Sequence, residues 1–191
     1  CVKNGGVLIP LDNSSIIMAD LGIGYRLSSF NPGGLFHPGS VVTVKSRGEN
    51  PLLYGYTEVF HVFKGNGRLL ETPLMDRHRM VLQYGTELLE DERPYEGEIR
   101  GMEEEENESE APDEDKDKEE TEATPTYVLS GMVRNQQTII GHGAIYEVPH
   151  GDGRVISFTF NPLHRFLNHH DSGLLWNAIM NWDYVANNPP D

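Results

Sequence analysis

The sequence has few of the features that mark a disulfide-rich or a membrane protein. Its 191 residues include a single cysteine, Cys1, so no disulfide can form within the chain. Cysteine usage therefore does not indicate an oxidising or a reducing compartment. No apolar run reaches the roughly 18 residues that a membrane helix needs, so we expect no membrane partner. The length suffices for one domain of ordinary size.

Basic residues are scarce in one segment, which carries all of the net charge. Between Glu87 and Glu122 there are 19 acidic and 4 basic residues, a balance of −15 that equals the net charge of the whole chain. The remainder is electrically balanced and gives no hint of a nucleic-acid surface, so no nucleic-acid partner is expected.

The acidic segment is also poor in apolar residues, with almost none after Met102. Such a stretch buries too little surface to offset chain entropy, which predicts a disordered insertion over residues 87–126. A solvated insertion and an acidic docking tail for a basic partner or Ca²⁺ both remain open, although the spacing does not match an EF-hand loop. The insertion divides one domain into a first part, residues 1–86, and a part with the C-terminal strands and helix, residues 127–191.

The chain is organised around the stretch from Gly151 to Trp182. Arg154–Phe160 is apolar and β-branched, which predicts a buried strand that ends at Asn161-Pro162. A tight turn at residues 150–153 predicts a hairpin with a strand over 144–148. Asp171 is the expected N-cap of an amphipathic helix whose apolar stripe comprises Leu174, Leu175, Ala178, Ile179 and Trp182. Strand, polar loop and helix together indicate an open α/β sheet.

Other segments predict short elements of the same fold. A short helix is expected over 13–21. Further strands are expected over 7–11, 41–45, 59–63, 68–70, 79–83 and 127–133.

Candidate binding residues follow the key strand, at the sheet edge where α/β proteins place ligands: Asn161, His164, Arg165, His169 and His170. Three imidazoles near each other can ligate a metal, but no HExxH motif or other tight spacing is present. Polar roles in the loop and at the helix start are the simpler interpretation, so no metal site is assigned.

Three blocks carry a resemblance to a known family: CVKNGGVLIPLDNSSIIMADLGI, FHPGSVVTVKSRGENPLLYGY and GHGAIYEVPHGDGRVISFTFNPLHRFLNHHDSGLLWNAIMNW. Together they resemble the C-terminal domain of bacterial zinc carboxypeptidases of the carboxypeptidase A class. In those proteins the peptidase domain precedes a domain similar to class I glutamine amidotransferases. The resemblance covers both ends of the chain but not the acidic insertion.

The resemblance implies a fold and a place in a larger protein. We expect an open, mostly parallel, flavodoxin-like and amidotransferase-like sheet with a β-rich insertion. Cys1 runs straight into what looks like the end of a helix, so we expect a fragment whose domain lacks its N-terminal part. A secreted or periplasmic location is expected from the family.

The resemblance also implies that catalysis is absent. The family's zinc ligands, an HxxE pair and a later His, lie in the peptidase domain, and this chain has no HxxE, so no cofactor is expected in the fragment itself. Active amidotransferases carry His-Pro-Glu where this sequence has Asn161-Pro162-Leu163. Asn cannot serve as a general base, because its amide takes up no proton near neutral pH.

We therefore expect a non-catalytic accessory domain of a zinc metallocarboxypeptidase. It would pack on its own peptidase domain, mediate assembly into a homo-oligomer or help to place substrate. The alternative is a ligand- or sugar-binding or hydrolytic domain that uses His164, Arg165 and His169. A third possibility is an interaction module that works through its acidic segment.

Overall fold

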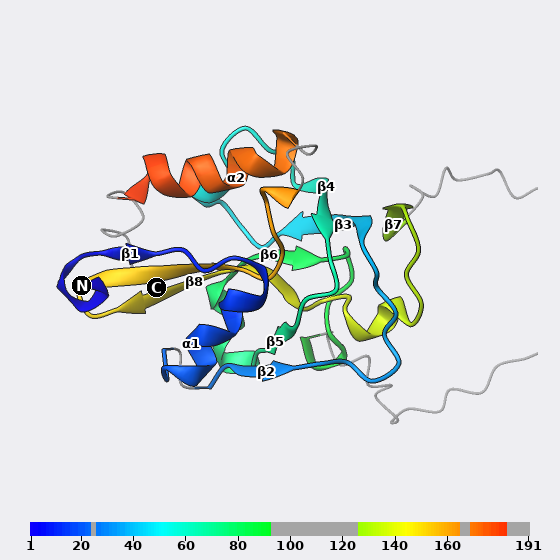
Figure 1. The fold of residues 1–191 in the computed structure, drawn as a ribbon, viewed down its shortest axis with the longest axis horizontal. Coiled ribbons are helices and arrows are strands. Elements are labelled where there is room, and N and C mark those ends of the chain that lie inside the picture. The colour runs from blue at the N-terminus through cyan, green and yellow to red at the C-terminus, as the bar shows by residue number, and fades with distance from the viewer. Residues whose placement is uncertain (24–25, 93–125, 165–168, 183–191) are drawn as a thin grey trace, which may run out of the picture.

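The computed structural model describes residues 1–23, 26–92, 126–164 and 169–182 (Figure 1). Residue 165, and most of the predicted disordered insertion, lie outside these ranges. The strands are β1 (Val7–Leu8), β2 (Ser28–Phe30), β3 (Ser40–Ser46), β4 (Val59–Lys64), β5 (Leu69–Glu71), β6 (Met80–Tyr84), β7 (Val128–Ser130), β8 (Gly143–His150) and β9 (Gly153–Phe158). The α-helices are α1 (Ile17–Asp20) and α2 (His169–Met180). The 3-10 helices are η1 (Val2–Asn4), η2 (Asp12–Ile16), η3 (Pro51–Leu53), η4 (Leu74–Arg79), η5 (Glu90–Glu92) and η6 (Gln136–Thr138).

The expected mostly parallel sheet is wrong. The main sheet has seven strands in the order β1-β9-β8-β6-β3-β4, with β7 paired to β3, and every pair is antiparallel except β1 with β9. A second, antiparallel sheet joins β2 and β5. The chain is therefore α+β, with a mixed sheet in place of a flavodoxin-like or amidotransferase-like one.

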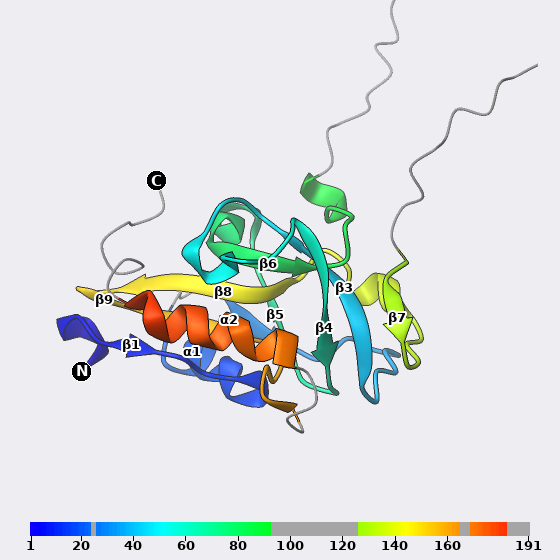
Figure 2. The same ribbon diagram turned by 90° about the horizontal axis from the view of Figure 1, so that it is seen from above.

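The reason for the error lies in the burial of β9. All six of its residues are buried, a pattern that is typical of central strands in parallel sheets. Here both faces are covered in a different way, since α2 lies over one side of the sheet and α1 over the other (Figures 1 and 2). Ile156 and Phe158 pack in one core with Leu174 of α2, and Val155 packs in a second core with Met18 of α1.

The predicted hairpin is confirmed. β8 and β9 pair antiparallel from Ile145 opposite Phe158 to His150 opposite Gly153. Gly151 in the turn has φ +65°, which glycine adopts without strain. A Cβ at Gly153 would run into the backbone oxygens of Val2 and Gly6, so glycine is what lets the N-terminal segment lie beside β9.

Residues on the two sides of the acidic segment share one sheet. β3, from the first part of the chain, pairs with β7 from the last, and β6 pairs with β8. The partners make a common core, because Val42, Tyr84, Tyr127 and Ala144 belong to one cluster of buried side chains. Residues 87–92 belong to the described structure and include η5, whereas 93–125 lie outside it.

The helix after β9 differs from its prediction at both ends. α2 begins at His169, so Asp171 lies within its first turn instead of capping it. Asp171 is 2% exposed, and its Oδ2 accepts a hydrogen bond of 2.8 Å from the backbone N–H of Phe63 in β4. Leu174 and Ala178 are buried as expected, but Ile179 and Trp182 are 43% and 53% exposed and are not core residues.

Candidate functional site

A large cleft lies over the ends of β3 and β6. It has a volume of about 1420 Å³. Its walls come from the segment that follows β3, from η3 and the loop after it, and from η5. Lys45, Arg47, Asn50, Tyr54, Tyr56 and Glu92 are among the residues that line it.

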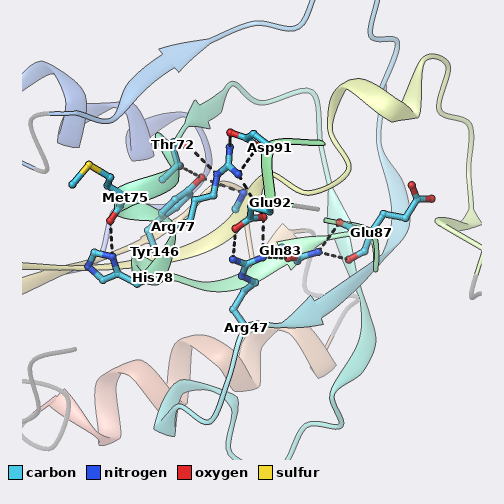
Figure 3. Close-up of polar contacts among 12 residues, drawn as sticks. Arg47, Thr72, Met75, Arg77, His78, Gln83, Glu87, Asp91, Glu92 and Tyr146 are labelled. Carbon is cyan, nitrogen blue, oxygen red and sulfur yellow. Dashed lines mark hydrogen bonds and ion pairs between the residues drawn. The ribbon is translucent and has the colours of Figure 1, made fainter. Parts of the chain in front are cut away.

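Arg47 stands where β3 ends, with its guanidinium directed at η5 (Figure 3). Its Nη2 donates to Oε1 of Glu92 at 2.6 Å and its Nη1 to Oε2 at 3.2 Å, a two-pronged contact with one carboxylate. Nη1 also donates to Oε1 of the buried Gln83 at 2.8 Å. The amide of Gln83 in turn donates to the carbonyl of Glu87 at 2.9 Å, so β6 fixes both the arginine and the start of the acidic segment.

Arg77 makes a second two-pronged contact with the same segment. It comes from η4, and its Nη1 and Nη2 donate to Oδ1 and Oδ2 of Asp91 at 2.6 and 2.7 Å (Figure 3). Because Arg77 donates these bonds, the pKa of the Asp91 carboxyl lies below its ordinary value. The same Nη1 lies 3.7 Å from Oε2 of Glu92, which brings both arginines to one pair of neighbouring carboxylates.

Buried polar groups fix the Nε atom of Arg77. Its Nε donates to the carbonyl of Thr72 at 3.2 Å, and the Thr72 hydroxyl donates to the Tyr146 hydroxyl at 2.8 Å. Burial raises the pKa of Tyr146 to about 12, so its hydroxyl stays protonated and donates to the carbonyl of Leu70. Arg77 lines a smaller cleft of about 410 Å³, together with Arg26, Glu71 and His142.

The opposite wall of the cleft is fixed by Asn50, which caps η3. Its Oδ1 accepts from the N–H of Leu52 at 2.9 Å, and Pro51 occupies the first helical position, which favours a helix start. Its amide donates to Oε2 of Glu147 at 2.8 Å, and Glu147 forms a buried ion pair with Arg154. Tyr54, two residues beyond Leu52, is 82% exposed on this wall.

The residues predicted from the loop after β9 do not converge on one centre in the described structure. Asn161 accepts a bond of 2.9 Å from the N–H of Leu163, which makes it a turn residue. The ring of His164 stacks on Phe63 at 4.1 Å, whereas the ring of His170 lies 5.7 Å from that of Phe60.

Phe60 and Phe63 point to opposite faces of β4, because successive side chains alternate across a strand. The two histidines therefore lie on opposite sides of the sheet edge. His169 is exposed at the start of α2, and Arg165 falls outside the described residues. The described ranges hold no group of three or more His, Cys, Asp or Glu side chains placed to bind a metal ion.

A buried set of charged and polar groups lies near the end of β4. Lys64 is 1% exposed, its amine donates to the carbonyl of Gly67 at 3.1 Å, and burial lowers its pKa to about 8. Burial, and then the charge of Lys64, lower the pKa of His37 to about 4. This amine is out of reach of a dissolved substrate, so we assign the set to the interior and not to a functional site.

Sequence reasoning missed Arg47 and Arg77 because each is far in sequence from the acidic residue that it binds. The one available signal was charge: an acidic run needs cations if any part of it is to lie on the folded surface. No helix among the described residues is long and apolar enough to span a bilayer. In comparisons with known proteins, no family model, curated protein or solved structure matched this chain.

Proposed function

We propose that this chain is a non-catalytic accessory module that holds a polypeptide segment in the cleft between η3 and η5. The family that the sequence resembles suggests that the segment belongs to a zinc carboxypeptidase or to the peptide on which it acts. The module would then help to place substrate. The observation that carries the proposal is the cleft itself, with the exposed Tyr54 on one wall and Arg47, bound to Glu92, on the other.

The size of the cleft favours an extended ligand. Small-molecule sites have volumes of roughly 300–1,000 Å³ and enclose most of their ligand. At about 1420 Å³ this cleft is larger and lies open along the surface. Tyr54 offers a large aromatic surface of the kind that anchors protein interfaces, and little side-chain entropy is lost when such a ring is covered.

The walls are fixed before any ligand binds, which lowers the cost of binding. The cap by Asn50 holds one wall. The carbonyls of Leu52 and Tyr54 accept bonds of 3.0 and 2.8 Å from the amide of Asn177 in α2. The hydroxyl of Tyr56 also donates to the carbonyl of His170, and burial raises its pKa to about 12, which keeps it a donor.

A second candidate function, packing against a neighbouring folded domain, rests on the outer face of α2. Trp176, Ile179 and Met180 are 60%, 43% and 76% exposed and lie on one face of the helix, since they are three and four residues apart. Exposed apolar patches often mark contact sites. The partner would be the peptidase domain of the same protein or a second copy of the chain. Light scattering on the wild type and on Trp176→Ser tests the second possibility, because only a self-associating chain would lose mass on substitution.

The cleft is tested with labelled hexapeptides of acidic, neutral and basic sequence, whose binding is followed by fluorescence anisotropy. We expect at least one peptide to bind, and Tyr54→Ala to weaken it about tenfold. Leu129→Ala is the matched control, because Leu129 is 63% exposed on β7 and does not line the cleft. If no peptide binds, or if both variants weaken binding equally, the proposal is wrong. Zinc and peptide substrates added to the chain should release no C-terminal residue.

A further inference from the structure

Arg47, which lines the cleft, and Arg77, which lines the smaller neighbouring cleft, are already bound to carboxylates of the chain itself. Glu92 occupies the guanidinium of Arg47, and Asp91 that of Arg77, each through two hydrogen bonds. The side chains of Arg77 and Glu92 are both 8% exposed and that of Arg47 is 19% exposed, so these contacts are partly shielded from water. Paired forks of this kind recognise carboxylates whatever chain supplies them.

The spacing of the two arginines fits two carboxylates in sequence. Asp91 and Glu92 are neighbours, and Arg77 reaches both of them, at 2.6 Å and 3.7 Å. A side-chain carboxylate followed by a second one, or by a terminal carboxylate, would present the same pair. Lys45, 38% exposed on the cleft lining, is paired with Glu58 at 3.4 Å, so Arg47 and Arg77 are the cations that the carboxylates would meet.

The segment that supplies these carboxylates is short. η5 has three residues, and the Asp91 side chain is 56% exposed, whereas that of Glu92 is 8% exposed. The hydrogen bond from the Gln83 amide to the carbonyl of Glu87 fixes the chain just before η5. None of its residues belongs to the two described cores, and its two carboxylates are held by the arginines.

We propose that Asp91 and Glu92 occupy the arginines in place of a ligand, and that the cleft binds peptides carrying two adjacent carboxylates, which compete with η5. This inference rests on the proposed function and adds to it the ligand class and its regulation. Because η5 is part of the same chain, it competes at a high effective concentration. The apparent affinity for an outside ligand is then reduced in proportion to the fraction of molecules whose arginines are free. Freeing the arginines should therefore tighten binding without any new contact.

The test is the affinity of a labelled hexapeptide that ends in Asp-Glu for four forms of the whole chain. We expect the double variant Asp91→Asn, Glu92→Gln to bind at least tenfold more tightly than the wild type. Glu90→Gln, an exposed residue of the same η5 segment, is the matched control and should bind as the wild type does. Adding Arg47→Gln to the double variant should abolish the gain.

Several results separate the inference from the proposed function. Equal affinity of the wild type and the double variant overturns the inference, and so does an equal gain in the Glu90→Gln control. If a neutral peptide binds and Tyr54→Ala weakens it while the acidic peptide does not bind, the inference fails and the proposed function stands. Inorganic phosphate serves as a competitor at matched ionic strength. If phosphate displaces the labelled peptide and an unlabelled peptide of the same sequence does not, the site binds anions without peptide selectivity and the inference is overturned. Circular dichroism confirms that each variant is folded.

Discussion

At the scale of single residues, the interior holds ionisable side chains that are shielded from water. Lys64 is almost fully buried and has one hydrogen bond, to Gly67. Oδ1 of Asp12 is buried and has no hydrogen-bond partner among the described residues, and neither ring nitrogen of His37 has one. Buried groups of this kind favour the uncharged form, which is why burial dominates the shifts of both Lys64 and His37.

The buried lysine predicts a pH dependence of stability. In the unfolded chain its pKa is about 10.5, and in the folded chain about 8, so between these values the unfolded state binds more protons. The free energy of unfolding should therefore rise with pH across this window, by up to roughly 3 kcal/mol if the whole shift is realised.

Urea unfolding of the wild type and of Lys64→Met between pH 8 and 9.5 measures the effect. This range lies below pH 10, near which tyrosines of the unfolded chain titrate. Tyr84 and Tyr146 have raised pKa values in the folded chain, so their titration lowers the free energy of unfolding as the pH rises. The difference in stability between the two proteins should change steadily with pH. A constant difference would contradict a depressed Lys64 pKa.

Single residues also show where sequence reasoning stopped. Asn161 was predicted as a binding residue, whereas its side chain accepts a hydrogen bond from the N–H of Leu163 in a turn. The arginine contacts were not visible in the sequence, because Arg47 and Glu92 come together only once β3 has paired with β6. Local patterns report on neighbours along the chain and carry little information on such distant pairs.

At the scale of elements, most strands were placed from the sequence. The alternation over 41–45 and 59–63 predicted β3 and β4, and the apolar run after Gly153 predicted β9. Apart from the hairpin of β8 and β9, their directions were not predicted, since a strand buried on both faces has the same composition in a parallel sheet as in an antiparallel one. α2 was predicted from its spacing, but its contact with the edge strand β4 through Asp171 was not.

That contact predicts the effect of a substitution at Asp171. Changing it to Ala removes the acceptor for the N–H of Phe63 and should cost about 1–3 kcal/mol of unfolding free energy, the usual penalty for a buried donor left unpaired. Ser172→Ala is the control, since its hydroxyl donates only within the first turn of α2, to His169. Hydrogen exchange at Phe63 should speed up in the first variant alone. Unchanged protection there would show that Asp171 does not hold the edge of the sheet.

At the scale of the whole molecule, most of the net charge lies outside the described residues. Residues 94–124 carry 15 acidic and 3 basic residues, so their removal would change the net charge from −15 to −3. Both cores consist of side chains from before residue 86 and after residue 126. The ion pairs of Arg47 and Arg77 also lie outside the removed part.

Replacing residues 94–124 by a flexible linker should therefore leave the fold intact. We expect the far-ultraviolet circular dichroism of the remainder to be unchanged and the melting temperature to shift by only a few degrees. The dependence of that temperature on salt should become weaker, since less like charge remains to be screened. A loss of cooperative melting would show that the acidic segment is part of the folded unit.

The parallel pair of β1 and β9 has a consequence for how the chain is made. Val7 pairs opposite Arg154, so about 147 residues separate partners that end up side by side. Closing so long a loop is slow, and β1 can dock only after β9 has emerged and paired with β8. Until then β9, which is buried along its whole length in the folded protein, is an open edge that can recruit strands from other chains. Slow dilution from denaturant, or a holding chaperone during synthesis, should raise the yield of monomer.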